Sequence, residues 1–321
     1  IPKYDVQALQ DEIAEAARSW SDKILDALIQ RDGEAAGHER LRRFRDAFGP
    51  AYQIRYTTDE VMADLDHIDA VATSGEIGFN LFRPEGGAAS TVHFKLYSPN
   101  DQIPLSDVLP AFEHMGFKVI NEAGPHEVRL ADAGFSRLVI HDFGLEQRSG
   151  AAIDVDAIRD NFEDAFARVW HGDAESDGFN ALVVGAGLSW RDIVVIRAYC
   201  KYLRQVGITF SQAYMEQTIA RHPDFAALLV QMFHAIFDPK TATKKKASPE
   251  PLRKSYLEKL ENVASADEDR ILRRFLNLLD STLRTNYFQP DEGGQPKSYV
   301  SFKINSRDIE DMPLPRPFRE I

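Results

Sequence analysis

Apolar and polar residues alternate with the period of a β-strand in two neighbouring segments, and with the period of a helix over most of the remaining chain. Residues 76–82 (EIGFNLF) and 91–97 (TVHFKLY) have the strand pattern. The glycine-containing stretch EGGAA at 85–89 separates them, with a length and composition typical of a hairpin. We therefore expect residues 76–97 to form two paired antiparallel strands.

The elements that follow have the order of a ferredoxin-like βαββαβ module. LSDVLPAFEHMG at 105–116 predicts a helix that ends at its glycine; two more strands and then a helix at 154–171 come after it. No convincing last strand follows, so the 76–82 strand is expected to take the edge next to the 91–97 strand. The sequence thus predicts an α+β fold, a four-stranded antiparallel sheet with both helices on one face, flanked by N-terminal and C-terminal helical segments.

Helical periodicity precedes this module. Apolar residues recur at helical spacing through 5–30 and 34–48. Thr57 and Glu60 have the spacing of a capping box, which is expected to open a third helix. These patterns predict a small helical segment over residues 1–73.

We place the ferredoxin-like module at residues 74–175. Beyond it, the chain again has helical periodicity. Proline and lysine mark 239–251 as a linker. A last strand is expected at 298–304, and because no partner is visible nearby, its partner is expected in a domain that the chain lacks. The sequence therefore predicts a helical bundle at 176–288 and a strand with a linker at 289–321.

Composition narrows the class of protein. The chain has 321 residues, 44% of them hydrophobic and 27% charged, and a formal net charge of −12. A net negative charge disfavours a nucleic-acid-binding surface, because such a surface needs a concentrated basic face. No apolar run in the sequence reaches the length of a membrane span. Cys200 is the sole cysteine, so no disulfide can form within the chain, and a reducing compartment, the cytoplasm, is expected.

Residues 183–190 (VVGAGLSW) contain a Gly-x-Gly that is typical of dinucleotide-binding loops. Trp190 stands where the third glycine of that motif belongs, and no second strand with an acidic end follows. Ser189 and Asp192 instead have the spacing of a helix cap. We therefore favour a helix that ends at Gly185 and Gly187 and a second helix that begins after them.

The rest of the sequence contains few candidates for catalytic or metal-binding residues. The nine histidines have no metal-ligand spacing. His141 and Asp142 could form a proton-transfer pair, but adjacent strand residues face opposite sides, so we expect both at the surface. The acidic stretch 173–178 is expected to be a solvated loop. No catalytic, cofactor-binding or metal-binding residue is assigned.

Several short segments occur along the chain in a characteristic order. They are RSWSD at 18–22, FGPAY at 48–52, LSDVLPAFEHMGF at 105–117, IHDF at 140–143, LSWR at 188–191, RAYCKYLRQ at 197–205, FSQAY at 210–214 and MPLPRPFRE at 312–320. Together they resemble one family, the large bacterial NAD-dependent glutamate dehydrogenases. The resemblance spans nearly the whole chain.

This resemblance implies an ACT-like module between helical segments, in the N-terminal regulatory portion of a very long subunit, with the catalytic core absent. The whole enzyme would oxidise glutamate to 2-oxoglutarate and ammonium with NAD, which would bind to the missing core. It would be a homo-oligomer in which this portion contacts its own catalytic domain and other subunits. The fragment alone is expected to be inactive.

ACT modules often bind an amino-acid effector at the loop between the first strand and helix. Here that loop is 99–104, and its candidate effector residues are Asn100, Asp101 and Gln102. Pro104 stands where the family usually has a glycine, and proline removes a backbone donor. A purely architectural or oligomerising role is therefore the alternative to effector binding. A separate alternative for the whole chain is a free-standing amino-acid-binding or protein-interaction module without catalysis.

Overall fold

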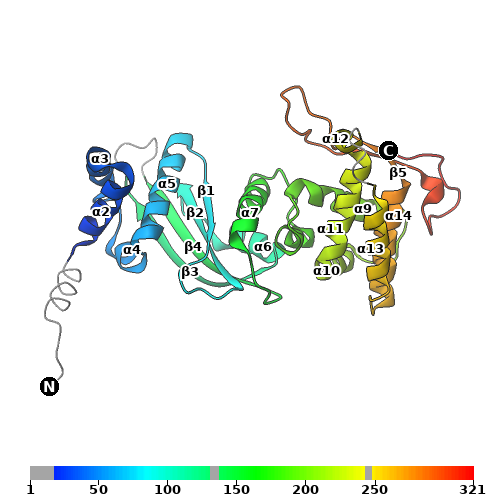
Figure 1. The fold of residues 1–321 in the computed structure, drawn as a ribbon, viewed down its shortest axis with the longest axis horizontal. Coiled ribbons are helices and arrows are strands. Elements are labelled where there is room, and N and C mark those ends of the chain that lie inside the picture. The colour runs from blue at the N-terminus through cyan, green and yellow to red at the C-terminus, as the bar shows by residue number, and fades with distance from the viewer. Residues whose placement is uncertain (1–17, 131–136, 243–247) are drawn as a thin grey trace, which may run out of the picture. The chain divides into compact units, whose positions relative to one another are not determined.

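The computed structural model describes residues 18–130, 137–242 and 248–321 (Figure 1). The chain divides into two compact units. The first comprises Ile1–Leu105 and Val119–Leu145, and the second Ser106–Lys118 and Glu146–Ile321. Each unit is described by itself below.

From residue 18, where the described part of the first unit starts, four helices precede the sheet: α2 (Trp20–Asp32), α3 (Glu34–Phe44), α4 (Pro50–Arg55) and α5 (Thr58–Ser74). The predicted capping box is confirmed, because the Thr57 side chain accepts from the Glu60 N–H while the Glu60 carboxylate accepts from the Thr57 N–H. The helix predicted over 34–48 ends at Phe44, and the short α4 was not predicted. Pro50 opens α4 in the first turn, where its missing N–H costs little.

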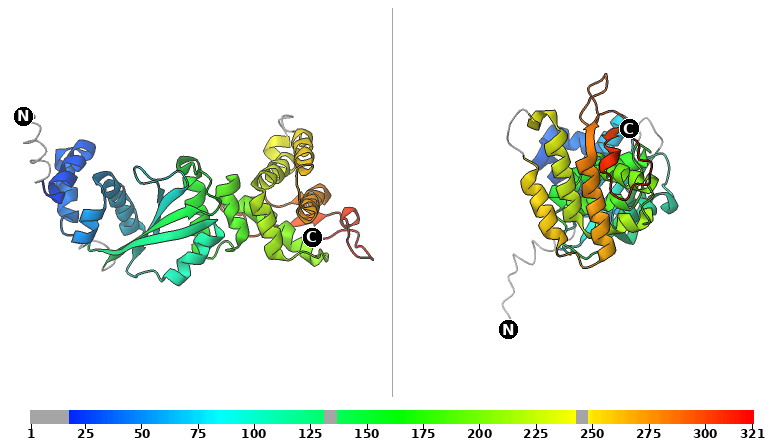
Figure 2. Two further views of the ribbon diagram at one scale, coloured as in Figure 1. Left: turned by 90° about the horizontal axis from the view of Figure 1, so that it is seen from below. Right: turned by 90° about the vertical axis from the view of Figure 1, so that its right-hand side faces the viewer.

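The sheet has four strands in the order β1-β2-β4-β3. They are β1 (Gly78–Phe82), β2 (Thr91–Pro99), β3 (Phe117–Val128) and β4 (Leu138–Gln147). β1 pairs antiparallel with β2, in a register that runs from Gly78 opposite Tyr97 to Phe82 opposite His93. The predicted α+β fold with a four-stranded antiparallel sheet is confirmed, and so is the position of the hairpin strand at the sheet edge (Figures 1 and 2).

α5 lies against β1 and β2 and covers one face of the sheet (Figure 2). Val61, Leu65 and Ile68 of α5 share one buried cluster with Tyr97 of β2. The approach is close at Gly78, where a Cβ atom would lie 2.9 Å from Cγ2 of Val71. This helix therefore joins the N-terminal helices to the sheet.

The second unit is largely helical. Its helices are α6 (Leu105–His114), α7 (Val155–Trp170), the 3-10 turn Gly178–Ala181, α8 (Leu182–Ala186), α9 (Trp190–Gln205), α10 (Gln212–Arg221), α11 (Pro223–Phe237), α12 (Pro239–Ala242), α13 (Glu250–Leu260), α14 (Ala266–Ser281) and the 3-10 turn Ser306–Asp308. Within the predicted linker 239–251, residues 243–247 lie outside the described residues. None of the helices in the described ranges combines the length and apolar character that crossing a bilayer requires.

The prediction that the last strand lacks a nearby partner is wrong. β6 (Phe302–Ile304) pairs antiparallel with β5 (Thr282–Thr285), a segment that was predicted to be helical. The Thr282 hydroxyl donates to the carbonyl of Leu278 at 2.8 Å as α14 ends. β-branched threonines favour extended backbone, which explains why the helical run stops here.

Candidate functional site

The predicted effector loop, residues 99–104, forms a tight turn after β2. Asn100 has a φ of 70°, a left-handed conformation that asparagine tolerates better than most residues. Its N–H donates to the Arg137 carbonyl at 2.8 Å, and its own carbonyl accepts from Nε of Arg137 at 2.7 Å. The side chains of Asn100, Asp101 and Gln102 are exposed, so their role as effector residues stays a prediction.

His141 of β4 holds the end of this loop. Its Nε2 accepts from the backbone N–H of Ile103 at 3.2 Å, and its Nδ1 lies 2.8 Å from Oε1 of Glu122 on β3. The imidazole is 0% exposed. The expectation that His141 lies at the surface is therefore wrong, because this strand is covered where the dipeptide occurs.

Asp142 belongs to a different polar cluster. Its Oδ2 accepts from the Tyr56 hydroxyl at 3.0 Å, and its Oδ1 lies 2.7 Å from Nδ1 of His93. The carboxylate is 1% exposed, so this residue is also buried rather than at the surface. His141 and Asp142 have separate sets of partners, as expected for adjacent strand residues.

Next to Asp142 lies a buried ion pair between α5 and β2. Both oxygens of Asp64 accept from Nζ of Lys95, at 2.9 and 2.7 Å. The Tyr97 hydroxyl donates to Oδ1 at 2.7 Å, and the Tyr52 hydroxyl donates to Oδ2. Nζ of Lys95 also lies 3.9 Å from the centre of the Tyr56 ring, a cation–π distance. Burial, followed by the Asp64 charge, raises the pKa of Tyr52 and of Tyr97 well above the ordinary value.

The chemistry open to this cluster is limited by its burial. Asp64 is 0% exposed and Lys95 is 1% exposed. A general acid or base must come within hydrogen-bond reach of a substrate. We therefore interpret the cluster as a polar connection between the N-terminal helices and the sheet.

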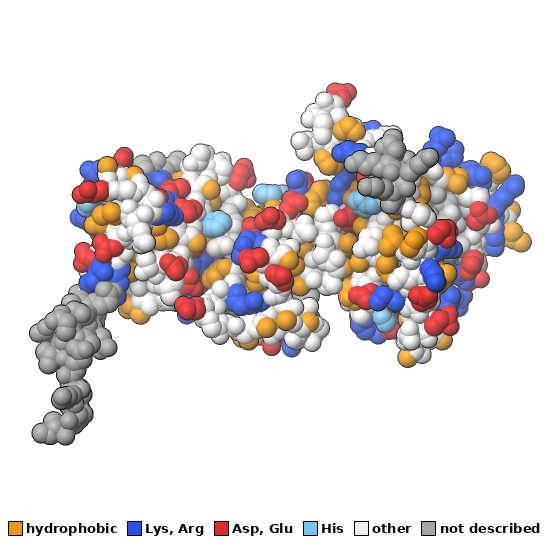
Figure 3. Space-filling view, in the orientation of Figure 1, with side chains coloured by type: hydrophobic (Ala, Val, Ile, Leu, Met, Phe, Trp, Pro, Cys, Tyr) orange, Lys and Arg blue, Asp and Glu red, His pale blue; other side chains and the backbone are white. Residues whose placement is uncertain are grey.

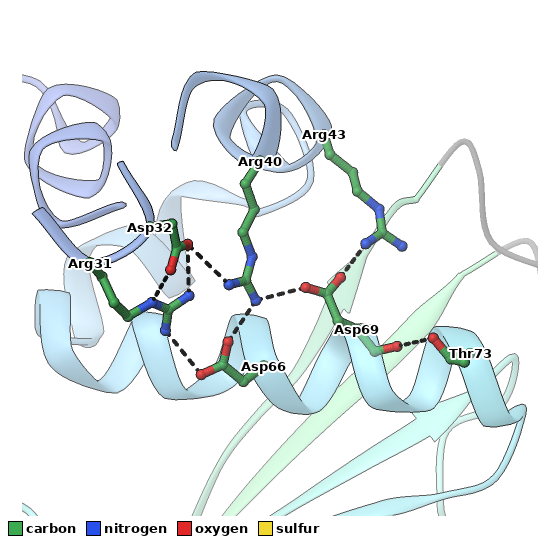
Figure 4. Close-up of polar contacts among 7 residues, drawn as sticks. All are labelled: Arg31, Asp32, Arg40, Arg43, Asp66, Asp69 and Thr73. Carbon is green, nitrogen blue, oxygen red and sulfur yellow. Dashed lines mark hydrogen bonds and ion pairs between the residues drawn. The ribbon is translucent and has the colours of Figure 1, made fainter. Parts of the chain in front are cut away.

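A second set of ion pairs joins α2 and α3 to the outer side of α5 (Figure 4). Arg31 pairs with Asp66 at 3.0 Å, and Arg40 contacts both Asp66 and Asp69 at 2.7 Å. On the face drawn in Figure 3, acidic and basic side chains are interspersed. Exposed pairs of this kind contribute about 0–1 kcal/mol each, so this set orients the helices more than it stabilises them.

In the second unit, Arg197 corrects the interpretation of the acidic stretch 173–178. Its Nε and Nη2 contact the two oxygens of Asp177 at 2.6 and 2.9 Å, and its side chain is 5% exposed. Part of the predicted solvated loop is thus fixed by a buried arginine. Cys200 is buried on the same helix as Arg197, and burial raises the pKa of its thiol to about 12.

The Gly185–Gly187 segment does not have the geometry of a dinucleotide site. Val183 lies in helix α8, Gly187 ends that helix with a φ of 64°, and Ser189 caps α9 by accepting from the Asp192 N–H at 3.2 Å. A pyrophosphate loop requires a strand before the glycines. The favoured interpretation of two helices separated by glycines is confirmed, and these residues do not fit NAD.

Comparison with known proteins gives four consecutive matches to domains of one enzyme. Glutamate dehydrogenase models match as follows: helical motif 2 at residues 27–71, the ACT3 domain at 76–158, helical motif 3 at 174–239, and the bacterial NAD-glutamate dehydrogenase catalytic domain at 255–321. The chain belongs to the family of large bacterial NAD-specific glutamate dehydrogenases. The catalytic-domain match begins at residue 255, well ahead of the 312–320 segment on which part of the resemblance rested.

Individual relatives agree with these matches. The chain is 36% identical over 319 residues to the NAD-specific glutamate dehydrogenase of Halomonas elongata and 35% identical over 320 residues to that of Pseudomonas aeruginosa. Identity to the Mycobacterium tuberculosis enzyme is 31% over 320 residues. These alignments cover 98–99% of this chain and 19–20% of each relative. The chain thus spans about a fifth of the length of the curated relatives that it matches.

Proposed function

We propose that this chain is a regulatory and assembly portion of an NAD-dependent glutamate dehydrogenase. The whole enzyme would convert L-glutamate and NAD to 2-oxoglutarate, ammonium and NADH in the cytoplasm. The observation that carries the proposal is the ACT3 match at 76–158 on a sheet of the order β1-β2-β4-β3. The NAD-specific names of the relatives support the choice of cofactor for the whole enzyme.

Activity measurements on two samples test this proposal. The full-length protein should form NADH from glutamate and NAD, whereas the purified chain 1–321 should show no turnover and no heat with NAD in calorimetry. Turnover by the chain alone would contradict the assembly role, and a full-length protein without glutamate-dependent NADH formation would contradict the enzyme itself.

The regulatory part of the proposal concerns the 99–104 loop. If an amino acid binds there, one of the twenty should raise the melting temperature of chain 1–321 through binding linkage. Replacement of Asp101 and Gln102 by alanine, both exposed, should then remove the shift without loss of folding. No shift with any amino acid would leave assembly with the catalytic domain and with other subunits of a homo-oligomer as the function.

The alternative is a free-standing amino-acid-binding or protein-interaction module. It predicts a reading frame that stops soon after Ile321, and binding of an amino acid or a protein that has no effect on glutamate oxidation. Sequencing of the gene downstream of Ile321 separates the two proposals.

A further inference from the structure

The contact with the 99–104 loop determines which nitrogen of the His141 ring carries the proton. The Ile103 N–H is a donor only, so Nε2 of His141, at 3.2 Å, must be an unprotonated acceptor. The ring proton of a neutral imidazole then lies on Nδ1 and is donated to Glu122, 2.8 Å away. The hydrogen-bond network therefore assigns the Nδ1–H tautomer of neutral His141.

A second proton on His141 would remove this contact. With hydrogen on both nitrogens, Nε2–H would face the N–H of Ile103, and two donors cannot bond to each other. The Ile103 side chain is 5% exposed and the imidazole 0%, so little water is at hand to replace the lost acceptor. A buried donor without a partner carries a large desolvation cost.

The charged groups around His141 determine what a protonated ring can pair with. Glu122 on β3, whose Oε1 lies 2.8 Å from Nδ1, would form an ion pair with an imidazolium. Arg137, which directly precedes β4, pairs with Glu127, and Asp142 bonds to His93 and Tyr56. The remaining charge in the loop, Asp101, is exposed. Glu122 is thus the charge in direct contact with the ring.

We propose that His141 is a pH-sensitive latch of the 99–104 loop. Neutral His141 holds the loop through the Ile103 N–H, whereas protonated His141 keeps its contact with Glu122 as an ion pair and can no longer accept from that N–H. The released donor stands on the loop that carries Asn100, Asp101 and Gln102, so the latch controls whether a backbone donor is free there. This inference holds whether or not the chain is part of a dehydrogenase.

His93 provides a matched control in the same sheet. Its Nδ1 lies 2.7 Å from Oδ1 of Asp142, and its ring is tilted against Phe82 with centroids 5.5 Å apart. Protonation of His93 strengthens a pair with a carboxylate, whereas protonation of His141 breaks a bond to an amide. The two histidines therefore respond differently to the same change in pH.

Amide hydrogen exchange of the full chain 1–321 tests the latch. After correction for intrinsic exchange, protection of the Ile103 amide should fall about tenfold on acidification, in step with protonation of His141, as expected for loss of one hydrogen bond. In His141→Gln, whose amide oxygen can accept from Ile103 at any pH, protection should be retained throughout the titration. His93→Gln should keep the wild-type pH dependence. Equal loss in wild type and His141→Gln, or no loss in wild type, would refute the latch.

A measurement on the wild-type protein keeps the test valid if His141→Gln does not fold. Nitrogen chemical shifts of the His141 ring should show Nε2 unprotonated where the Ile103 amide is protected, and protonated where that protection is lost. A neutral ring with its hydrogen on Nε2 would overturn the assignment. Glu122→Gln removes the favourable charge and should move the loss of Ile103 protection to lower pH.

Discussion

Replacement of Asp64 by alanine should cost far more stability than any other change of an acidic residue on α5. Asp64 accepts from Lys95 through both oxygens and from the hydroxyls of Tyr52 and Tyr97, and it is 0% exposed. Breaking a buried ion pair on one side costs about 3–5 kcal/mol. Each buried hydroxyl left without its acceptor adds about 1–3 kcal/mol. Partial relaxation reduces the sum, so we expect a loss of about 4–7 kcal/mol.

The assay is urea denaturation of wild-type and variant protein, followed by circular dichroism. Asp66 provides the matched control, because it lies on the same helix but is 55% exposed, in pairs with Arg31 and Arg40. Asp66→Ala should cost about 1 kcal/mol or less. A loss below about 1.5 kcal/mol for Asp64→Ala, or equal losses for the two variants, would refute the reasoning.

A rescue experiment separates the ion pair from simple loss of packing. Replacement of the whole polar set by apolar residues (Asp64→Leu, Lys95→Met, Tyr52→Phe and Tyr97→Phe) removes every buried group that would lack a partner. Apolar replacements of buried ion pairs are often neutral or stabilising, so most of the stability lost in Asp64→Ala should return. If the fourfold variant is no more stable than Asp64→Ala, then the charge of Lys95 is not the cause of the loss.

Three further predictions concern Asn100, Cys200 and two histidines. Asn100→Val should lower stability by about 1–2 kcal/mol in thermal melts, because a β-branched residue is strained at a φ of 70°, whereas Asn100→Gly should be nearly neutral. Cys200 should react with a thiol reagent at pH 8 at least about 100 times more slowly in the folded chain than in urea, because burial raises its pKa to about 12. Burial lowers the pKa of His67 and of His126, so on acidification from pH 7 to 5 the unfolded chain takes up protons first and the folded state loses stability. Urea titrations at both pH values should show this loss, and a double His→Gln variant should show a smaller one.

The parts of the fold that follow from local pattern could be predicted from the sequence. The strand alternation at 76–82 and 91–97 and the glycines between them are sufficient for the β1–β2 hairpin, and the absence of a last strand leaves that edge to β1. Capping residues such as Thr57 also mark their helix correctly, because a cap depends on neighbours within one turn. These features need no knowledge of distant residues.

The polar site could not be predicted in this way, because it depends on the covering of both faces of β2. Phe94 and Leu96 are buried, and so are Lys95 and Tyr97 on the alternate side. From the alternation of apolar and polar residues alone, the polar side chains of β2 are expected to face solvent. Nothing in that pattern shows that another element covers the polar face as well. One available signal was Asp64, which interrupts the apolar stripe of α5 and therefore needs a buried partner.

The connection between α5 and the sheet has a consequence for how the chain can be divided. The family models separate helical motif 2 at 27–71 from the ACT3 domain at 76–158, yet Lys95 and Tyr97 find their acceptor on α5, at Asp64. A protein that begins at residue 76 would expose the apolar surface covered by α5 and leave the Lys95 ammonium without its carboxylate. We therefore expect residues 76–175 to aggregate or to be less stable than residues 18–175, by an amount comparable to Asp64→Ala. Equal denaturation midpoints for the two proteins would show that the sheet does not need α5.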